Sequence, residues 1–516
     1  MLSLKEKIGQ MLVVGFKGLE PPEYILDWLG RGRIGGVILF SRNIENPKQL
    51  ADLTKACREA SNRPILVAID QEGGVVARLR EGCGFTESPG AMALAVAGSE
   101  ELAEEVSHVL AVEMSALGIN WNLAPVLDLA HNIDNPSVGV RSLGVDPREV
   151  RRLGMAQVRG FQRVGVASTA KHLPGKADTP VDPHKNLPVI DGRLEDMRDN
   201  DLVPFKGAIE AGVAAVMITH VKFRDLEPEY PSTMSPRIIQ KLLRGEMGYR
   251  GVITTDCMEM RAVTNLYGPG ESAVIAARAG ANIILFSHTR DHQEEAYRAL
   301  LDAVKSESLS TDKVDFSVKK ILEMKNKFPT KKKMTTQVIH SPEHTALTLE
   351  AARRGTAILK NNLAAIPIET EENRDIALLE FASQDSVASE EHTLLAEQIS
   401  NRIPRISSVI IAPNKPSKEA IDEVIRTASS ADLTILATRN AHLKPEQRGL
   451  AQKILTAGRE VVHLCLRNPY DAGVLTGAGS VICTFGDSHP SLVAASEALT
   501  GGFNPPGKIP VPIATR

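Results

Sequence analysis

The stretch Gly165-Val-Ala-Ser-Thr-Ala-Lys-His-Leu-Pro-Gly-Lys-Ala-Asp-Thr-Pro-Val-Asp-Pro-His184 joins an apolar run to a cluster of ionisable side chains. Its first six residues, Gly165 to Ala170, are small or β-branched, which is typical of a buried strand. The fourteen residues from Lys171 to His184 hold two histidines, two aspartates, two lysines and three prolines. Because proline and glycine interrupt strands and helices, we expect these charged groups to lie on a stiff loop.

Apolar runs of this kind recur through the first 325 residues, with amphipathic segments between them. The eight runs are Ile8 to Phe16, Gly35 to Phe40, Ile65 to Asp70, Asn120 to Asp128, Gly165 to Ala170, Ala214 to Val221, Gly251 to Asp256 and Ala281 to Phe286. The segments between them, such as Pro47 to Ala60, carry apolar residues at helical spacing. Eight strands alternating with helices predict an α/β fold that begins with a (β/α)8 TIM-like barrel.

Five of the predicted strands end in ionisable side chains. These are Asp70 on the third strand, Asp128 on the fourth, Lys171 and His172 on the fifth, His220 on the sixth and Asp256 on the seventh. Buried charges are costly unless they are paired, and active sites of such barrels lie at the carboxyl ends of the strands. We therefore expect one site on this rim, with Arg141 nearby, whose planar guanidinium suits two parallel hydrogen bonds to a ligand.

A second pattern of short strands and helices begins near residue 345. It comprises helices Thr345 to Arg354 and Lys418 to Ser429, and strands Thr356 to Lys360, Ile376 to Glu380, Ser408 to Ala412, Leu433 to Thr438, Val461 to Leu466 and Ser480 to Thr484. This pattern predicts a mostly parallel sheet between two layers of helices, an α/β/α sandwich. The predicted domains are the barrel at 1–325, a basic linker at 326–344 and the sandwich at 345–516.

Composition narrows the classes of function. The charges of the 60 basic and 63 acidic residues nearly cancel. The sequence has no basic stripe with interleaved aromatic residues, which argues against nucleic acid as a partner. Five scattered cysteines indicate reduced thiols, and no uncharged apolar run reaches the length of about eighteen residues that a membrane span needs. We expect no cofactor, no metal and a cytoplasmic location unless a leader has been removed.

Four sets of residues together resemble glycoside hydrolase family 3. They are Ile69-Asp-Gln-Glu-Gly-Gly-Val-Val-Ala-Arg-Leu79, Ala124-Pro-Val-Leu-Asp128 with Asn135-Pro136 and Arg141-Ser142, Lys171-His-Leu-Pro-Gly175 with Asp182-Pro-His184, and Thr255-Asp256 with Met260. Within the family, the chain is most similar to the branch of β-N-acetylhexosaminidases that release N-acetylglucosamine from cell-wall fragments. The resemblance extends over nearly the whole chain.

The resemblance implies a retaining, exo-acting β-N-acetylglucosaminidase. Asp256 is then the nucleophile, and His184 is the general acid and base with Asp182 as its partner. The substrate-binding residues are Asp70, Arg141, Lys171 and His172, and we add His220 from the end of the sixth strand. A histidine suits both proton transfers because its ordinary pKa lies close to neutral pH.

Two departures from the family pattern bear on specificity: Lys176 stands where a histidine is usual, and Cys257 follows Asp256. Four alternative functions are considered. A phosphorylase or a broad β-glycosidase would use the same residues. A barrel metal hydrolase would place His-x-His at the first strand, where this chain has Val13-Val-Gly-Phe16, and a silent sugar-binding protein would be expected to lack Asp256 or His184.

Overall fold

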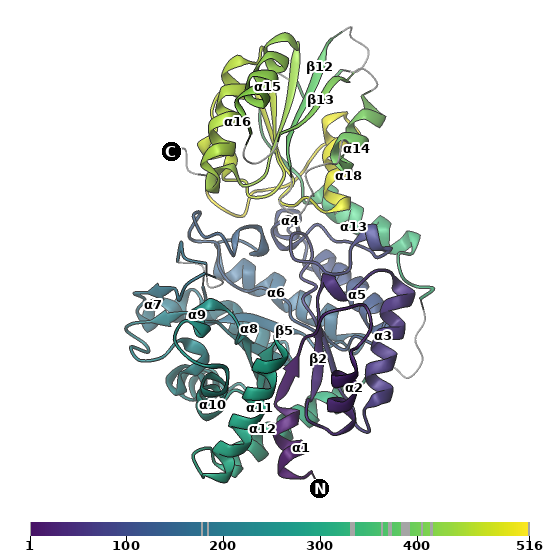
Figure 1. The fold of residues 1–516 in the computed structure, drawn as a ribbon. Coiled ribbons are helices and arrows are strands. Elements are labelled where there is room, and N and C mark those ends of the chain that lie inside the picture. Colours follow the sequence, from purple (N-terminus) through teal and green to yellow (C-terminus); the bar gives the residue numbers. More distant parts are fainter. Residues whose placement is uncertain are drawn as a thin grey trace.

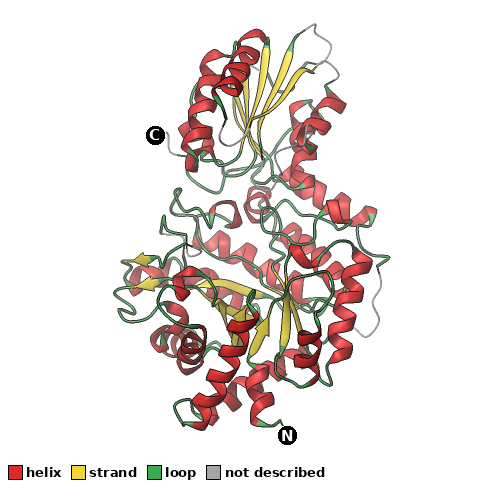
Figure 2. Ribbon diagram, in the orientation of Figure 1, coloured by secondary structure: helices red, strands yellow, loops and turns green. Residues whose placement is uncertain are grey.

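The computed structural model describes residues 2–176, 179–182, 185–330, 336–362, 365–369, 374–382, 393–403, 406–412 and 416–513. An eight-stranded barrel surrounded by helices carries a second sheet with helices on both of its faces (Figure 1; Figure 2). The predicted fold class is therefore confirmed. No helix in the part of the chain that the structure describes is long and apolar enough to cross a membrane.

The barrel strands are all parallel to their neighbours. They are β1 (Leu12–Val14), β2 (Gly36–Leu39), β3 (Leu66–Ile69), β4 (Trp121–Asn122), β5 (Thr169–Leu173), β7 (Ala215–Ile218), β9 (Val252–Cys257) and β10 (Ile283–Phe286), in the spatial order β4-β3-β2-β1-β10-β9-β7-β5. Backbone hydrogen bonds join the two ends of this order: the Asn122 N–H donates to the Ala167 carbonyl at 2.8 Å and the Thr169 N–H to the Ala124 carbonyl at 2.8 Å. A short parallel pair outside the barrel is formed by β6 (Val189–Ile190) and β8 (Lys222–Phe223).

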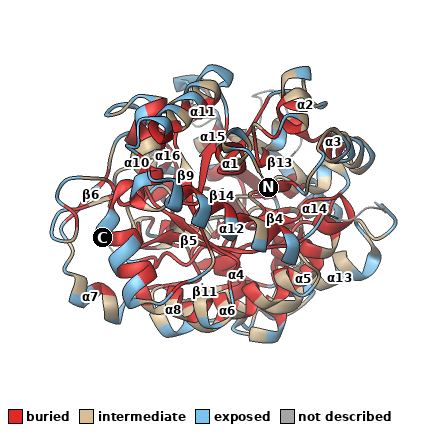
Figure 3. Ribbon diagram, turned by 90° about the horizontal axis from the view of Figure 1, so that it is seen from below, coloured by how far each residue is buried: buried red, intermediate tan, exposed pale blue. Residues whose placement is uncertain are grey.

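The barrel helices follow the amphipathic segments. They are α1 (Leu4–Gln10), α2 (Glu23–Gly30), α3 (Pro47–Ala60), α4 (Ala91–Ala97), α5 (Glu100–Ala116), α6 (Pro147–Gln162), α7 (Leu194–Asp199), α8 (Leu202–Glu210), the π-helix η5 (Arg237–Glu246), α9 (Arg261–Thr264), α10 (Pro269–Ala279), α11 (Arg290–Lys305) and α12 (Thr311–Lys327). In α3, the Asn46 side chain accepts from the Gln49 N–H, and Leu50 and Leu53 face the core. Buried residues gather on the strands and the inner faces of the helices, and exposed residues lie outside (Figure 3).

Two local predictions were wrong. Ile8 to Gln10 belong to helix α1 rather than to the first strand, because Ser3 and Glu6 form a reciprocal capping box that starts a helix. Lys171 and His172 lie within β5 rather than on a loop, because carboxylates from neighbouring strands pair with both side chains.

The second domain contains a six-stranded sheet. Its elements are α13 (Pro342–Arg354), β11 (Ala357–Asn361), β12 (Ile376–Phe381), α14 (Leu394–Arg402), β13 (Ile406–Ala412), α15 (Lys418–Ser430), β14 (Leu433–Thr438), α16 (Pro445–Ala457), β15 (Val461–Cys465), α17 (Asp471–Val474), β16 (Ser480–Cys483) and α18 (His489–Leu499). The strand order is β11-β16-β15-β14-β12-β13, with only β11 antiparallel to its neighbour among these strands. Helices α15 and α16 lie on one side of the sheet and α14 and α18 on the other (Figure 1).

The second domain sits on two loops of the barrel rim, which follow β3 and β4. The His489 N–H donates to the Glu87 carboxylate at 2.8 Å, and the Val145 N–H donates to the Pro510 carbonyl at 3.2 Å. Gly139 has a φ of 45°, and a Cβ there would lie 2.5 Å from the Asn468 Oδ1 atom. The second domain therefore fixes the path of the loop that leads to Arg141. The exact domain boundaries stay a prediction.

Candidate active site

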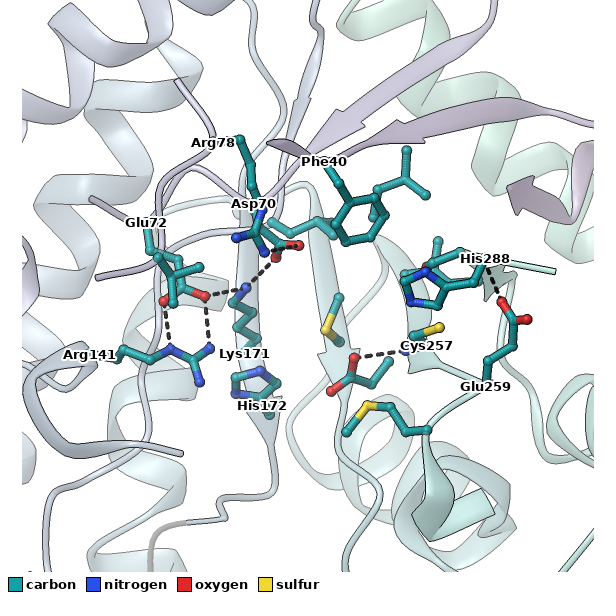
Figure 4. Close-up of a pocket in the computed structure, with 18 of the residues that line it drawn as sticks. Phe40, Asp70, Glu72, Arg78, Arg141, Lys171, His172, Cys257, Glu259 and His288 are labelled. Carbon is teal, nitrogen blue, oxygen red and sulfur yellow. Dashed lines mark hydrogen bonds and ion pairs between the residues drawn. The ribbon is translucent and has the colours of Figure 1, made fainter. Parts of the chain in front are cut away.

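A cavity of about 390 Å³ opens at the carboxyl ends of the barrel strands. Its walls include predicted site residues from four separate segments of the chain, namely Asp70, Arg141, Lys171, His172 and Asp256. Five of the eight predicted site residues thus line one pocket, as the strand-end argument requires. Figure 4 shows the side chains of this pocket.

One half of the pocket is held by a buried network of two carboxylates and two cations (Figure 4). Arg141 donates from Nε and Nη2 to the two oxygens of Glu72, both at 2.8 Å. The Lys171 ammonium lies 2.6 Å from Glu72 and 2.8 Å from Asp70. The side chains of Glu72 and Lys171 are 5% and 2% exposed, so these ion pairs are shielded from water and salt.

The network keeps Glu72 and Lys171 charged. Burial alone raises the pKa of Glu72, but Arg141 and Lys171 outweigh it and hold that pKa well below its usual range. Burial lowers the pKa of Lys171, yet Asp70 and Glu72 reverse the effect and leave it above its usual value. Arg141 and Lys171 keep further N–H groups beyond those that the carboxylates accept, so both can donate to a ligand.

A second buried chain of contacts runs from Asp128 through His172 to Lys176. The His172 Nδ1 atom lies 2.6 Å from the Asp128 carboxylate, which can only accept, so Nδ1 carries the proton. On the other side of the ring, Nε2 lies 3.2 Å from the Lys176 Nζ atom. The Lys176 backbone N–H also donates to Asp128 at 3.0 Å, which fixes the start of the segment that follows β5.

Asp256 lies near the end of β9 and faces the same cavity. Its Oδ1 atom accepts a hydrogen bond from the Cys257 N–H at 2.7 Å. Burial raises the pKa of Asp256, but the positive charges of His220 and Lys176 outweigh this and bring it below its usual value. The pocket therefore presents an ionised carboxylate to whatever occupies it.

His220 is buried and does not belong to the wall of this cavity. Thr233 donates its hydroxyl proton to the Thr219 carbonyl, so it accepts from the His220 Nδ1 atom at 2.6 Å. The Cys257 carbonyl accepts from Nε2 at 2.9 Å. With both nitrogens as donors, His220 is a cation beside Asp256. Its role in substrate binding stays a prediction from the sequence.

The predicted acid/base pair is only partly described. His184 lies outside the described residues. Asp182 is described, and its backbone carbonyl accepts from the Lys185 N–H at 2.9 Å. The catalytic roles of both residues remain predictions from the sequence.

Sequence reasoning assigned no function to Glu72, although it stands two residues after Asp70 in a quoted motif. The feature that could have identified Glu72 is its position as a second carboxylate just after a predicted strand. The Glu259 carboxylate accepts from the backbone N–H groups of His288 and Thr289 at 2.6 and 2.9 Å. Glu259 thereby fastens the loop after β10 to the loop after β9.

Among the described residues, no three His, Cys, Asp or Glu side chains are arranged to hold a metal ion. The site instead combines an ionised carboxylate with a separate set of hydrogen-bonding cations and carboxylates. In a (β/α)8 barrel, such a pocket is typical of a glycoside hydrolase, which needs a nucleophilic carboxylate and many partners for hydroxyl groups.

The chain belongs to glycosyl hydrolase family 3, because the model of the N-terminal domain of that family matches residues 3–324. A β-hexosaminidase of Stenotrophomonas maltophilia is 37% identical over 307 residues, which cover 58% of this chain and 89% of that protein. Beta-hexosaminidase A of Pseudoalteromonas piscicida is 32% identical over 370 residues, or 66% of this chain and 62% of that protein.

Solved structures give the same family. A family 3 β-N-acetylglucosaminidase from a Paenibacillus species is 34% identical, has a TM-score of 0.92 and matches 100% of both chains. A fungal multi-domain β-N-acetylglucosaminidase is also 34% identical, with a TM-score of 0.93, but the chain spans only 61% of its length. A β-glucoside phosphorylase at 24% identity shares the fold, with a TM-score of 0.85.

Proposed function

We propose that the protein is an exo-acting, retaining β-N-acetylglucosaminidase that removes terminal N-acetylglucosamine from glycosides derived from cell walls. The observation that carries this proposal is the ionised, partly buried carboxylate of Asp256 in a pocket lined by partners for sugar hydroxyls. The names of the similar β-hexosaminidases and β-N-acetylglucosaminidases support the choice of sugar.

In the proposed reaction, an oxygen of Asp256 forms a bond to the anomeric carbon while the bond from that carbon to the leaving oxygen breaks. His184, oriented by Asp182, gives its proton to the leaving oxygen. Water then attacks the anomeric carbon, His184 takes one proton from it, and the bond to Asp256 breaks. Two displacements on one carbon return the β configuration.

The buried network supplies the binding interactions of the proposal. Asp70 accepts hydrogen bonds from sugar hydroxyls, while Lys171 and Arg141 donate to hydroxyls or to the acetamido carbonyl. Since these groups are already held by their mutual contacts, they need little rearrangement when a sugar binds. This arrangement favours a sugar that satisfies their remaining hydrogen-bonding capacity.

We expect an aryl β-N-acetylglucosaminide to be cleaved with a kcat/KM about a hundredfold or more above that of the aryl β-glucoside. Buried partners left unpaired by the missing amide cost about 1–3 kcal/mol each, and two such losses amount to about two factors of ten. Steady-state kinetics on the two substrates measure the ratio. Comparable values would indicate a broad β-glycosidase instead.

The same assay, repeated with phosphate, separates hydrolysis from phosphorolysis. We expect free N-acetylglucosamine as the main product under both conditions. N-acetylglucosamine 1-phosphate as the main product in the presence of phosphate would contradict the hydrolase assignment and leave the pocket and nucleophile unchanged.

Replacement of His184 by glycine should affect substrates unequally. An aryl leaving group of low pKa needs little proton assistance, whereas a sugar leaving group needs much, and general acid catalysis contributes about 10²–10⁴-fold. We therefore expect a far larger loss of kcat/KM on a disaccharide than on a nitrophenyl glycoside. An equal loss on both substrates would remove His184 as the acid.

A further inference from the structure

Lys176 is a buried cation that the proposed mechanism leaves without a role. Its side chain is 3% exposed and forms part of the cavity wall. The segment that carries it is fixed on both sides, because the Lys176 N–H donates to Asp128 and its carbonyl accepts from the Asn135 side chain at 2.9 Å. The backbone at Lys176 is therefore held in place by the fold.

The His172 ring gives the Lys176 side chain a hydrogen-bond partner beside the cavity. The His172 Nδ1–H group donates a hydrogen bond to Asp128, so a neutral imidazole ring has a lone pair on Nε2. An ammonium at 3.2 Å can donate to that lone pair. Lys176 thus occupies the side of the His172 ring that faces the cavity, where a ligand would otherwise meet the histidine.

Lys176 also acts on Asp256, which lines the same cavity. The positive charge of Lys176 helps to lower the pKa of Asp256, and the negative charge of Asp256 opposes the lowering of the Lys176 pKa. Loss of the Lys176 charge would leave Asp256 with less compensating positive charge, which favours a cationic ligand.

We propose that Lys176 is a specificity-determining residue of this pocket. Its ammonium, held by His172, donates a hydrogen bond to the bound sugar and offsets the charge of Asp256, so that the pocket selects neutral sugars over cationic ones. The inference rests on the proposed function in that it takes the pocket to be the sugar site.

The titration of Lys176 follows from its surroundings. Burial lowers the pKa of Lys176 to about 8, Arg141 and Lys171 act in the same direction, and Asp128 and Asp256 oppose them. These residues and His172 are the charged or titratable groups that face it from the neighbouring strands and loops in the described part of the chain. Near pH 6.5 the ammonium form prevails, and it is lost as the pH rises through about 8.

The test compares two ligands of similar shape by calorimetry at pH 6.5. One is neutral N-acetylglucosamine, and the other is a piperidine analogue that carries the acetamido group and a protonated ring nitrogen. In Lys176→Met, we expect N-acetylglucosamine to bind about tenfold more weakly, because a charge-assisted hydrogen bond is lost. We expect the cationic analogue to bind about tenfold more tightly, so the affinity ratio changes about a hundredfold.

Two further variants separate charge from hydrogen bonding. Lys176→Gln keeps a donor but lacks the charge, so its affinity ratio should follow that of Lys176→Met. Lys176→Arg keeps the charge and should stay close to the wild-type ratio. Lys176→Gln also provides the same measurement if Lys176→Met does not fold.

A matched control is Lys325→Met. Lys325 is 1% exposed, and burial lowers its pKa to about 7, but it contacts Gln10 and the Gly35 carbonyl before β2, at the opposite end of the barrel. We expect it to change thermal stability and not the affinity ratio.

The pH dependence gives a second readout. Wild-type affinity for N-acetylglucosamine should fall above about pH 8, and this step should be absent in Lys176→Met. A folded Lys176→Met or Lys176→Gln whose affinity ratio stays within about threefold of wild type overturns the inference. Wild-type protein that binds neither ligand overturns the proposed function and this inference with it.

Discussion

Replacement of Asp256 by alanine is expected to lower kcat on an aryl β-N-acetylglucosaminide by about 10⁴-fold or more, as for other enzymes that lose their nucleophile. The physical reason is the position of this carboxylate, which lies ionised in the cavity while Asp70 and Glu72 are tied to Lys171. Neither of these two is free to form the glycosyl-enzyme. The measurement is kcat of purified variant and wild type, with circular dichroism as the test of folding.

Azide provides the control for this variant. A small anion that enters the space vacated by Asp256 attacks the same face of the sugar, so the product is the α-glycosyl azide. If azide restores turnover but gives the β-azide, the lost group was a proton donor. Near-wild-type kcat in a folded variant would remove Asp256 as the nucleophile.

Replacement of Glu72 by glutamine is expected to lower the free energy of unfolding by about 3–5 kcal/mol, the range for a buried ion pair that loses one partner. The amide keeps the shape of the side chain, but Arg141 and Lys171 then remain buried with less compensating charge. Urea unfolding of wild type and variant measures the difference, and KM for the substrate should rise because the proposed function has both cations bind the sugar. A matched control is Glu100→Gln, whose partner Arg159 is 38% exposed, so the loss should stay below about 1 kcal/mol.

The stabilisation by Glu72 should depend on pH in a defined direction. Its pKa in the folded protein lies well below the ordinary 4.5, so its contribution is complete above pH 4.5 and decreases as the pH falls further. The gap in unfolding free energy between wild type and Glu72→Gln should therefore narrow steadily below pH 4.5. A gap that is independent of pH in this range would mean that the carboxylate is not held by its charge.

The barrel could be predicted from the sequence because its parallel strands are buried on both faces and read as short apolar runs. Each of the eight runs overlaps a strand of the barrel. The errors arose where local signals competed. At Ile8 the run continues an apolar pattern, but the capping residues Ser3 and Glu6 start a helix. At Lys171 the charge suggested a loop, but Asp70 and Glu72 make a buried lysine acceptable within β5.

The rim position of the pocket residues was also predictable, since parallel strands bring their carboxyl ends together. The ion pairs and hydrogen bonds among these residues were not predictable, because they depend on distances between separate strands and loops. Arg141 was expected to grip a ligand with its fork, and the structure gives that fork to Glu72. His220 was expected to bind the substrate, and the structure shows it bonded to the hydroxyl of Thr233 behind the cavity wall. Neither partner is close in sequence to the residue it binds.

The second domain packs on the loops after β3 and β4, and this contact restricts which truncated or domain-swapped versions of the chain can be made. Met92, Val96 and Val140 of the barrel rim form one apolar cluster with Tyr470 and Phe485 of the second domain. A barrel produced alone would open this cluster to water and favour aggregation. Exchange for an unrelated sandwich domain would also remove the surface against which Gly139 is fitted, so Glu72 would be left to position Arg141 without the support of the second domain.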